Sequence, residues 1–175
     1  MALGMAVGVV FTPRRSTARV VADRAEAVEY TLGAQSYRAA EIKQEIVVLT
    51  QYVFFEYVIL SRRDGSLFGV LDAHKLVRIL SRQPGPYSWE SFAKQVNSDR
   101  PEDLNTLKSI PSFADGKLAV TPQTDKKDVL EKMQVSNRDW LPVVSAQRHF
   151  LGVVSLSQLT ASMILDVTKQ LQQER

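Results

Sequence analysis

An internal repeat constrains the fold of this 175-residue chain more than any other feature of its sequence. Two apolar segments, Leu67–Leu71 and Phe150–Val154, each contain one glycine, and the two glycines lie 83 residues apart. The same offset, applied without gaps, aligns Val58 with Leu141, Leu76 with Leu159 and Ile46 with Val129. Self-similarity at a fixed offset indicates one supersecondary unit used twice.

Each copy has the pattern of a helix, a strand, a hairpin turn, a second strand and a second helix. In copy one, Ile42, Ile46 and Leu49 recur at helical spacing, and Asp64-Gly65 between apolar runs is a strong hairpin signal. A single unit leaves one face of its small sheet uncovered. We therefore predict an α/β fold in which two tandem β-α-β-β-α repeats pack sheet face to sheet face with pseudo-twofold symmetry.

The same patterns predict the boundaries of the segments. We expect an N-terminal strand and helix element in 1–37, repeat one in 38–82, a helical insert in 83–109, repeat two in 110–167 and a C-terminal tail in 168–175. Within the first segment, 6–11 has the composition of a buried strand, and 18–32 that of an added helix. A short strand over 118–121, ended by Pro122, opens copy two.

Composition excludes several classes of protein. With no cysteine, the chain has no disulfide, thiolate nucleophile or cysteine-ligated zinc, and we expect a cytoplasmic location. The net charge of +3 comes largely from Arg14, Arg15, Arg19 and Arg24, without interleaved aromatic residues, so we expect no nucleic-acid partner. Arg14, Arg15 and Arg19 are interpreted as a solvated helix start, or as contacts to acidic lipid. The apolar run 1–11 is too short to span a bilayer.

Two segments of copy two carry a family resemblance. Leu141-Pro142-Val143-Val144 is followed by Gly152-Val153-Val154-Ser155-Leu156-Ser157-Gln158-Leu159. This pattern resembles the cystathionine-beta-synthase (CBS) domain family, whose tandem pairs are called Bateman modules, and copy one matches it more loosely. The resemblance covers about residues 38–165. It implies a regulatory, non-catalytic homodimer that binds AMP, ADP, ATP or S-adenosylmethionine between its repeats.

The resemblance also implies a set of ligand-binding residues. In the family, a Ser or Thr contacts phosphate, an Asp contacts the ribose, and the strand before the hairpin contacts the base. Carried over by position, the candidates are Trp140, Leu141, Pro142, Val143, Ser155 and Gln158 in copy two, Tyr57, Val58, Asp72 and Lys75 in copy one, and Val120 and Thr121 before the second helix. A hydroxyl at a helix start lies beside free backbone N–H groups, which favour phosphate.

The chain departs from the family pattern at both sites. Gln158 stands where the ribose-binding Asp is expected and gives a hydrogen bond without charge assistance. In copy one, Asp72 would repel phosphate, and Lys75, which replaces the Asp, could instead attract an anion. Copy two is therefore the favoured site. Ser155 is equally well explained as a helix cap, Trp140 as core and Lys75 as a solvated lysine.

These departures keep an alternative function open: a ligand-free dimerisation or interaction module of a larger, membrane-bound protein. The two histidines, His74 and His149, do not occupy matching repeat positions, so we expect no metal site. The sequence has no glycine-rich phosphate loop and no nucleophile elbow, so we expect no enzyme activity.

Overall fold

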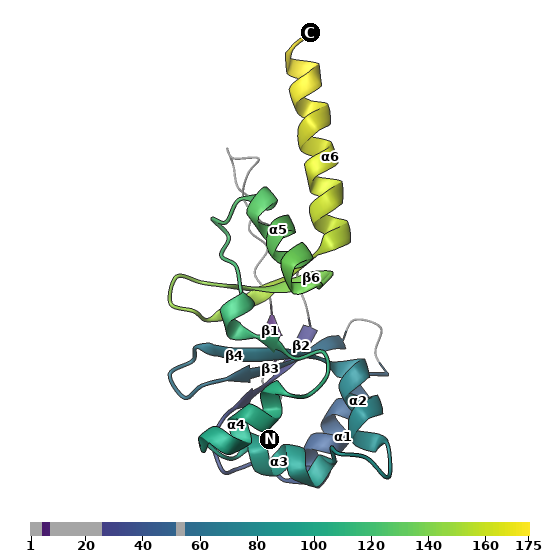
Figure 1. Cartoon of the computed structure of the whole chain (residues 1–175), viewed down its shortest axis with the longest axis vertical. Helices are drawn as coiled ribbons and strands as arrows, with labels where there is room; N and C mark the ends of the chain where they lie inside the picture. The colour runs from purple at the N-terminus through teal and green to yellow at the C-terminus, as the bar shows by residue number, and fades with distance from the viewer. Residues whose placement is uncertain (1–4, 8–25, 52–54) are drawn as a thin grey trace.

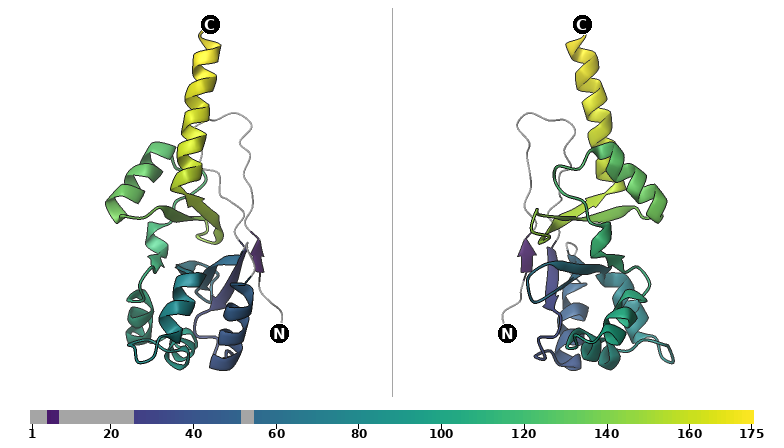
Figure 2. Two further views of the ribbon diagram at one scale, coloured as in Figure 1. Left: turned by 90° about the vertical axis from the view of Figure 1, so that its right-hand side faces the viewer. Right: turned by 60° about the vertical axis from the view of Figure 1, so that its left-hand side comes forward.

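The computed structural model describes residues 5–7, 26–51 and 55–175 (Figure 1). Its elements are β1 (Met5–Val7), β2 (Glu26–Thr31), α1 (Ala39–Leu49), β3 (Phe55–Ser61), β4 (Leu67–Asp72), α2 (Ala73–Ser81), α3 (Trp89–Val96), α4 (Pro101–Lys108), β5 (Ala114–Asp115), the 3-10 helix η1 (Gly116–Leu118), α5 (Lys126–Ser136), β6 (Trp140–Val144), β7 (Phe150–Ser155) and α6 (Leu156–Gln173). One sheet has the order β1-β2-β3-β4-β5, and a second pairs β6 with β7. Helices α1 to α4 cover the outside of the larger sheet, and α5 and α6 lie beyond the smaller one (Figures 1 and 2).

The first strand of repeat one is β2, in a region where the sequence predicts a helix over 18–32. It runs parallel to β3 and buries Ala27, Val28 and Tyr30. A strand that is buried on both faces does not alternate between apolar and polar residues, so its pattern imitates a helix. Repeat one is therefore β2-α1-β3-β4-α2, and it includes residues that the sequence assigns to a separate element. Of the predicted strand over 6–11, the described residues 6–7 lie in β1, which pairs antiparallel with β2. Residues 1–4 and 8–25, which include Arg14, Arg15, Arg19 and Arg24, lie outside the described residues.

Repeat two has the same order but a reduced first strand. The predicted strand over 118–121 is a single parallel bridge between Val120 and Val143, and η1 occupies the residues before it. Helix α5 and the β6–β7 hairpin follow as predicted. Helix α6 continues to Gln173, so most of the expected tail over 168–175 is helical. No glycine or proline interrupts the chain after Leu156, which lets the helix continue.

The repeat offset of 83 residues holds for the strands but not for the first helices. Ile42 and Ile46 are the buried residues of α1, and they correspond in position to Val129 and Met133 of α5, which lie 87 residues later. The gapless alignment of Ile46 with Val129 is thus wrong by four residues, because the chain is four residues longer between α1 and Tyr57 than between α5 and Trp140. Four residues is about one helical turn, so both alignments match apolar faces.

The two hairpin turns repeat one hydrogen-bond pattern. The bonds are Arg62 N to Ser66 O (2.9 Å) and Gly65 N to Arg62 O (2.9 Å) in repeat one, and Ser145 N to His149 O (2.8 Å) and Arg148 N to Ser145 O (2.9 Å) in repeat two. Gly65 and Arg148 occupy equivalent positions and both adopt positive φ, +85° and +70°. The two repeats therefore share backbone geometry at the hairpin turn as well as the apolar pattern of their sequences.

The two sheets pack against each other through their inner faces, as the sequence predicts. Ile59 and Val70 of the larger sheet meet Val144 and Val153 of the smaller one in a single buried cluster. At the hairpins, the backbone N–H of Leu67 donates to the carbonyl of Arg148 at 2.9 Å. Each repeat covers the apolar face that the other would expose.

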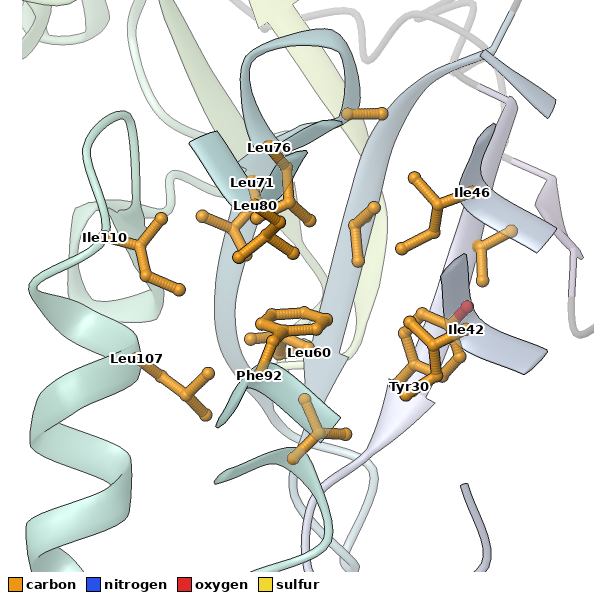
Figure 3. Close-up of a cluster of buried hydrophobic side chains, with 14 of the residues drawn as sticks. Tyr30, Ile42, Ile46, Leu60, Leu71, Leu76, Leu80, Phe92, Leu107 and Ile110 are labelled. Carbon is orange, nitrogen blue, oxygen red and sulfur yellow. The ribbon is translucent and has the colours of Figure 1, made fainter. Parts of the chain in front are cut away.

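The insert between the repeats packs on the outer face of the larger sheet. Phe92 of α3 and Leu107 of α4 join Leu60, Leu71 and Ile42 in the largest buried cluster (Figure 3). Ser88 caps α3 in a capping box with Ser91, and Pro101 occupies the first turn of α4. The insert is therefore part of the core of repeat one.

Gly69 provides a test of the core. A Cβ added there would overlap the Phe113 ring and lie 3.0 Å from the carbonyl oxygen of Ala114. We predict that Gly69→Ala lowers the free energy of unfolding by about 1–3 kcal/mol, measured by chemical denaturation. In a Phe113→Leu background the same substitution should lower it by less, because the ring is gone. An equal loss in both backgrounds would contradict this explanation.

Candidate functional site

The predicted phosphate-binding positions lie at two equivalent corners, each where a strand ends and a helix begins. At the β4–α2 corner, the Asp72 carboxylate accepts a hydrogen bond from Lys75 N at 2.9 Å. At the β7–α6 corner, the Ser155 hydroxyl accepts from Gln158 N at 3.3 Å, and Gln158 Oε1 accepts from Ser155 N at 3.4 Å. Ser155 and Gln158 thus form a capping box, and both corner residues cap their helices.

Tyr57 and Trp140 bring the two corners together. Tyr57 is the cross-strand partner of Asp72, and Trp140 is the partner of Ser155. The two rings are in contact, with their centroids 5.0 Å apart and their planes inclined at 55°. The residue that caps each helix is therefore the cross-strand neighbour of a ring in the Tyr57–Trp140 contact, which joins the two repeats.

The apolar candidates contribute backbone rather than side chains to any such site. Val58, Leu141 and Val143 are completely buried, and their side chains belong to the helix-covered clusters of their own repeats. Val120 is also buried. Thr121 is half-buried, and its backbone N–H donates to the hydroxyl oxygen of Thr124 at 3.0 Å. A ligand at this edge would meet carbonyl and N–H groups of the strands.

The two corners differ in charge. Asp72 is half-buried and brings a carboxylate to the start of α2, while Lys75 is exposed. Ser155 is half-buried and Gln158 exposed, so the corner of repeat two carries no charge of its own. The Asp72 carboxylate therefore opposes an anion at the first corner, while the second corner has no carboxylate among these residues.

Arg138 is a cation beside the corner of repeat two that the sequence analysis did not single out. Its guanidinium lies 5.8 Å from the centre of the Trp140 ring and donates to the carbonyls of Ser112, at 3.3 Å, and Phe113. Partial burial lowers the pKa of Arg138, which the Asp139 carboxylate partly opposes, and an arginine stays charged throughout. Its place two residues before Trp140, the first residue of β6, was the available sequence signal.

A cavity of about 480 Å³ adjoins this corner, between the end of α5 and the first turn of α6. It is lined by Leu130, Met133, Gln134, Asn137, Arg138, Asp139 and Leu156. None of the predicted ligand-binding residues lines it, although Leu156 follows Ser155 directly. Its size lies in the range of small-molecule pockets.

In the described part of the chain, no group of three or more His, Asp or Glu side chains is arranged to hold a metal ion. His74 lies on α2 and His149 in the β6–β7 turn, and both are exposed. Among the helices described, none combines the length and apolar character needed to cross a membrane.

Comparisons with known proteins support the fold. No protein-family profile and no curated protein matches the sequence. Among solved structures, the cytosolic domain of the Mg²⁺ channel MgtE in complex with ATP aligns with a TM-score of 0.51 at 18% identity, over 88% of this chain and 50% of that one. CBSX2 in complex with AMP aligns with a TM-score of 0.47 at 14% identity, over 81% of this chain and 89% of that one. The CBS domains of a transcriptional regulator from Streptococcus pneumoniae align with a TM-score of 0.43 at 11% identity, over 75% of this chain and 86% of that one.

The chain has the fold of a tandem CBS domain pair. The likeness to the MgtE domain covers both repeats, and it agrees with the shared element order and hairpin geometry of the two halves. The resemblance predicted from the sequence is thereby confirmed at the level of fold.

The contact between Tyr57 and Trp140 gives a test of how the corners are joined. We predict that Tyr57→Leu and Trp140→Leu are non-additive, with a coupling energy of about 0.5–1.5 kcal/mol in a double-mutant cycle of unfolding free energies. The cycle cancels whatever else each ring contacts. Trp89 provides the control, because it is buried in the separate cluster under the insert. Tyr57→Leu should be additive with Trp89→Leu, and additivity in both pairs would rule out the proposed coupling.

Proposed function

We propose that this chain is a non-catalytic regulatory module that binds an adenine nucleotide or related adenosyl metabolite at the corner of repeat two. One observation carries the proposal: two equivalent strand-to-helix corners meet at the Tyr57–Trp140 contact between the repeats. A ligand bound there touches one helix start and lies beside the second repeat. Ligand binding can then shift the equilibrium between different arrangements of the two repeats.

Repeat two is the favoured site for electrostatic and geometric reasons. Its corner offers a hydroxyl and an amide without a carboxylate, and Arg138 supplies a positive charge beside Trp140. The capping bonds between Ser155 and Gln158, at 3.3 and 3.4 Å, are long and therefore weak, so a phosphate oxygen can replace them. Trp140 is half-buried and offers ring surface to a base.

The choice of ligand class also draws on the fold. The MgtE domain with this fold was solved with ATP, and CBSX2 was solved with AMP. We therefore place nucleotides first among the ligands to test, as regulatory ligands and not as cofactors. The regulatory effect follows only if the ligand binds one arrangement of the repeats more tightly than another.

Ligand binding should raise the melting temperature of the full chain. We predict a rise that grows with the concentration of ATP, AMP or S-adenosylmethionine, measured by differential scanning fluorimetry. Ser155→Ala should abolish the rise, because it removes the hydroxyl. Asp72→Ala is the matched control, since each substitution removes one helix cap and costs about 1 kcal/mol of stability. Asp72→Ala should keep the rise, and loss of the rise in both variants would point to general destabilisation instead.

The alternative function, a ligand-free interaction module, also has a specific observation in its favour. Ser155 and Gln158 already satisfy each other, so the corner of repeat two is complete as a helix cap. If none of the three ligands shifts the melting temperature of the unmodified chain, this alternative replaces the sensor.

Gln158 offers a test of ligand orientation. We predict that Gln158→Asp tightens nucleotide binding about fivefold, which corresponds to about 1 kcal/mol, because a carboxylate forms stronger hydrogen bonds to ribose hydroxyls. Isothermal titration calorimetry measures the change. Lys75→Asp, the same substitution at the equivalent position of repeat one, should leave the affinity at repeat two unchanged. Weaker binding by Gln158→Asp would place phosphate, rather than ribose, beside this residue.

A further inference from the structure

Arg138 connects the two repeats, in addition to lying beside the corner of repeat two. It follows α5 in repeat two, and its Nη1 and Nη2 groups donate to the carbonyls of Ser112, at 3.3 Å, and Phe113. These two residues follow α4, and the Phe113 ring belongs to the largest buried cluster, which is the core of repeat one. The guanidinium therefore holds the end of the insert against the turn that opens β6.

The positive charge of Arg138 is bonded only to neutral groups among the described residues. The side chain is half-buried, and none of the ion pairs formed by those residues includes it, although Asp139 is its neighbour in sequence. Carbonyl oxygens carry partial charge, so they compensate a partly buried cation less well than an anion does. Because a phosphate bonds a guanidinium more strongly than a carbonyl does, a phosphate that reaches Arg138 displaces the weaker bonds.

The loop that accepts these bonds is itself strained. Ser112 adopts a positive φ of +75°, a conformation that residues other than glycine rarely take. Its hydroxyl oxygen is buried and has no hydrogen-bond partner in the described part of the chain. Both features cost free energy, so the loop keeps this conformation only because the contacts around it, including those of Arg138, impose it.

The opposite end of the contact between the repeats is formed by the hairpin turns. Leu67 N donates to Arg148 O at 2.9 Å, and Arg148 Nη2 donates to Gly116 O at 2.6 Å. The turns also touch, because a Cβ added to Gly65 would lie 3.0 Å from Nε2 of His149. None of these residues belongs to the predicted ligand-binding set. A ligand at the corner therefore acts on one end of the contact and leaves the other in place.

We propose that Arg138 is a phosphate-sensitive strap between the repeats. A ligand phosphate at the corner of repeat two draws the guanidinium away from the carbonyls of Ser112 and Phe113, and the repeats move apart at the corner while the hairpin turns keep them joined. This inference rests on the proposed function for the place of the ligand, and it names the phosphate as the group that acts. ATP carries that group and adenosine does not, so ATP alone of the two releases the strap.

Pulsed electron paramagnetic resonance of the full chain tests the strap, with spin labels on introduced cysteines, which are unique because the chain has no native cysteine. Labels at Asn105→Cys on α4 and Val135→Cys on α5 report the corner end. Labels at Asp99→Cys and Gln147→Cys report the hairpin end, and all four positions are exposed. We expect ATP to lengthen the corner distance and to leave the hairpin distance unchanged, whereas adenosine should change neither.

Arg138→Gln tests the strap without any ligand. The substitution removes the charged fork, so the corner distance should become longer or more broadly distributed, and ATP binding should weaken about tenfold by isothermal titration calorimetry. Arg148→Gln is the matched control, because it removes another arginine that donates to a main-chain carbonyl, at the hairpin end. It should leave the corner distance and the ATP affinity unchanged.

The outcomes separate this inference from the proposed function. An unchanged corner distance in Arg138→Gln overturns the strap, and so does an equal response to ATP and adenosine. A rise in melting temperature with ATP, without a change in the corner distance, overturns the strap and leaves the proposed function standing. If ATP gives no such rise, the phosphate response is overturned as well, while the Arg138→Gln distances still decide whether Arg138 joins the repeats.

Discussion

The burial of two apolar sheet faces against each other is the constraint on which the rest of this structure depends. Ile59 and Val70 from one repeat, and Val144 and Val153 from the other, are buried only because the repeats meet. Neither sheet could keep its inner face in water as a stable unit, so the two halves form one module. The same packing brings Tyr57 against Trp140 and so creates the boundary at which a ligand could act.

Hydrogen bonds from arginines to main-chain carbonyls hold the loops around this packing. Arg148 donates to Gly116 O at 2.6 Å, Arg138 to Phe113 O and Arg63 to Gly33 O. These cations satisfy loop carbonyls that would otherwise lack partners away from water. The basic character of the chain is therefore partly structural, which agrees with the absence of a nucleic-acid signature in its sequence.

The two strand-to-helix corners differ at one equivalent residue position. Asp72 and Ser155 occupy the same place in the two repeats, and each caps a helix. The carboxylate is the stronger electrostatic partner of a helix start, whereas the hydroxyl leaves the corner neutral and open to an anion. Divergence between the repeats at this position thus leaves a negatively charged cap in repeat one and a neutral cap in repeat two.

The sequence by itself determined the repeat, the α/β class, the hairpins and the cap at Ser155, because each shows in a short local pattern of apolar, turn or capping residues. Only the tertiary structure decided that β2 is a strand, since its burial on both faces comes from partners distant in sequence. It also corrected the alignment of α1 with α5 by four residues, which an apolar pattern repeating at each turn could not resolve. The meeting of Tyr57 with Trp140, and the place of Arg138 beside it, likewise follow from the packing of one repeat on the other, and local pattern carries no information about that packing.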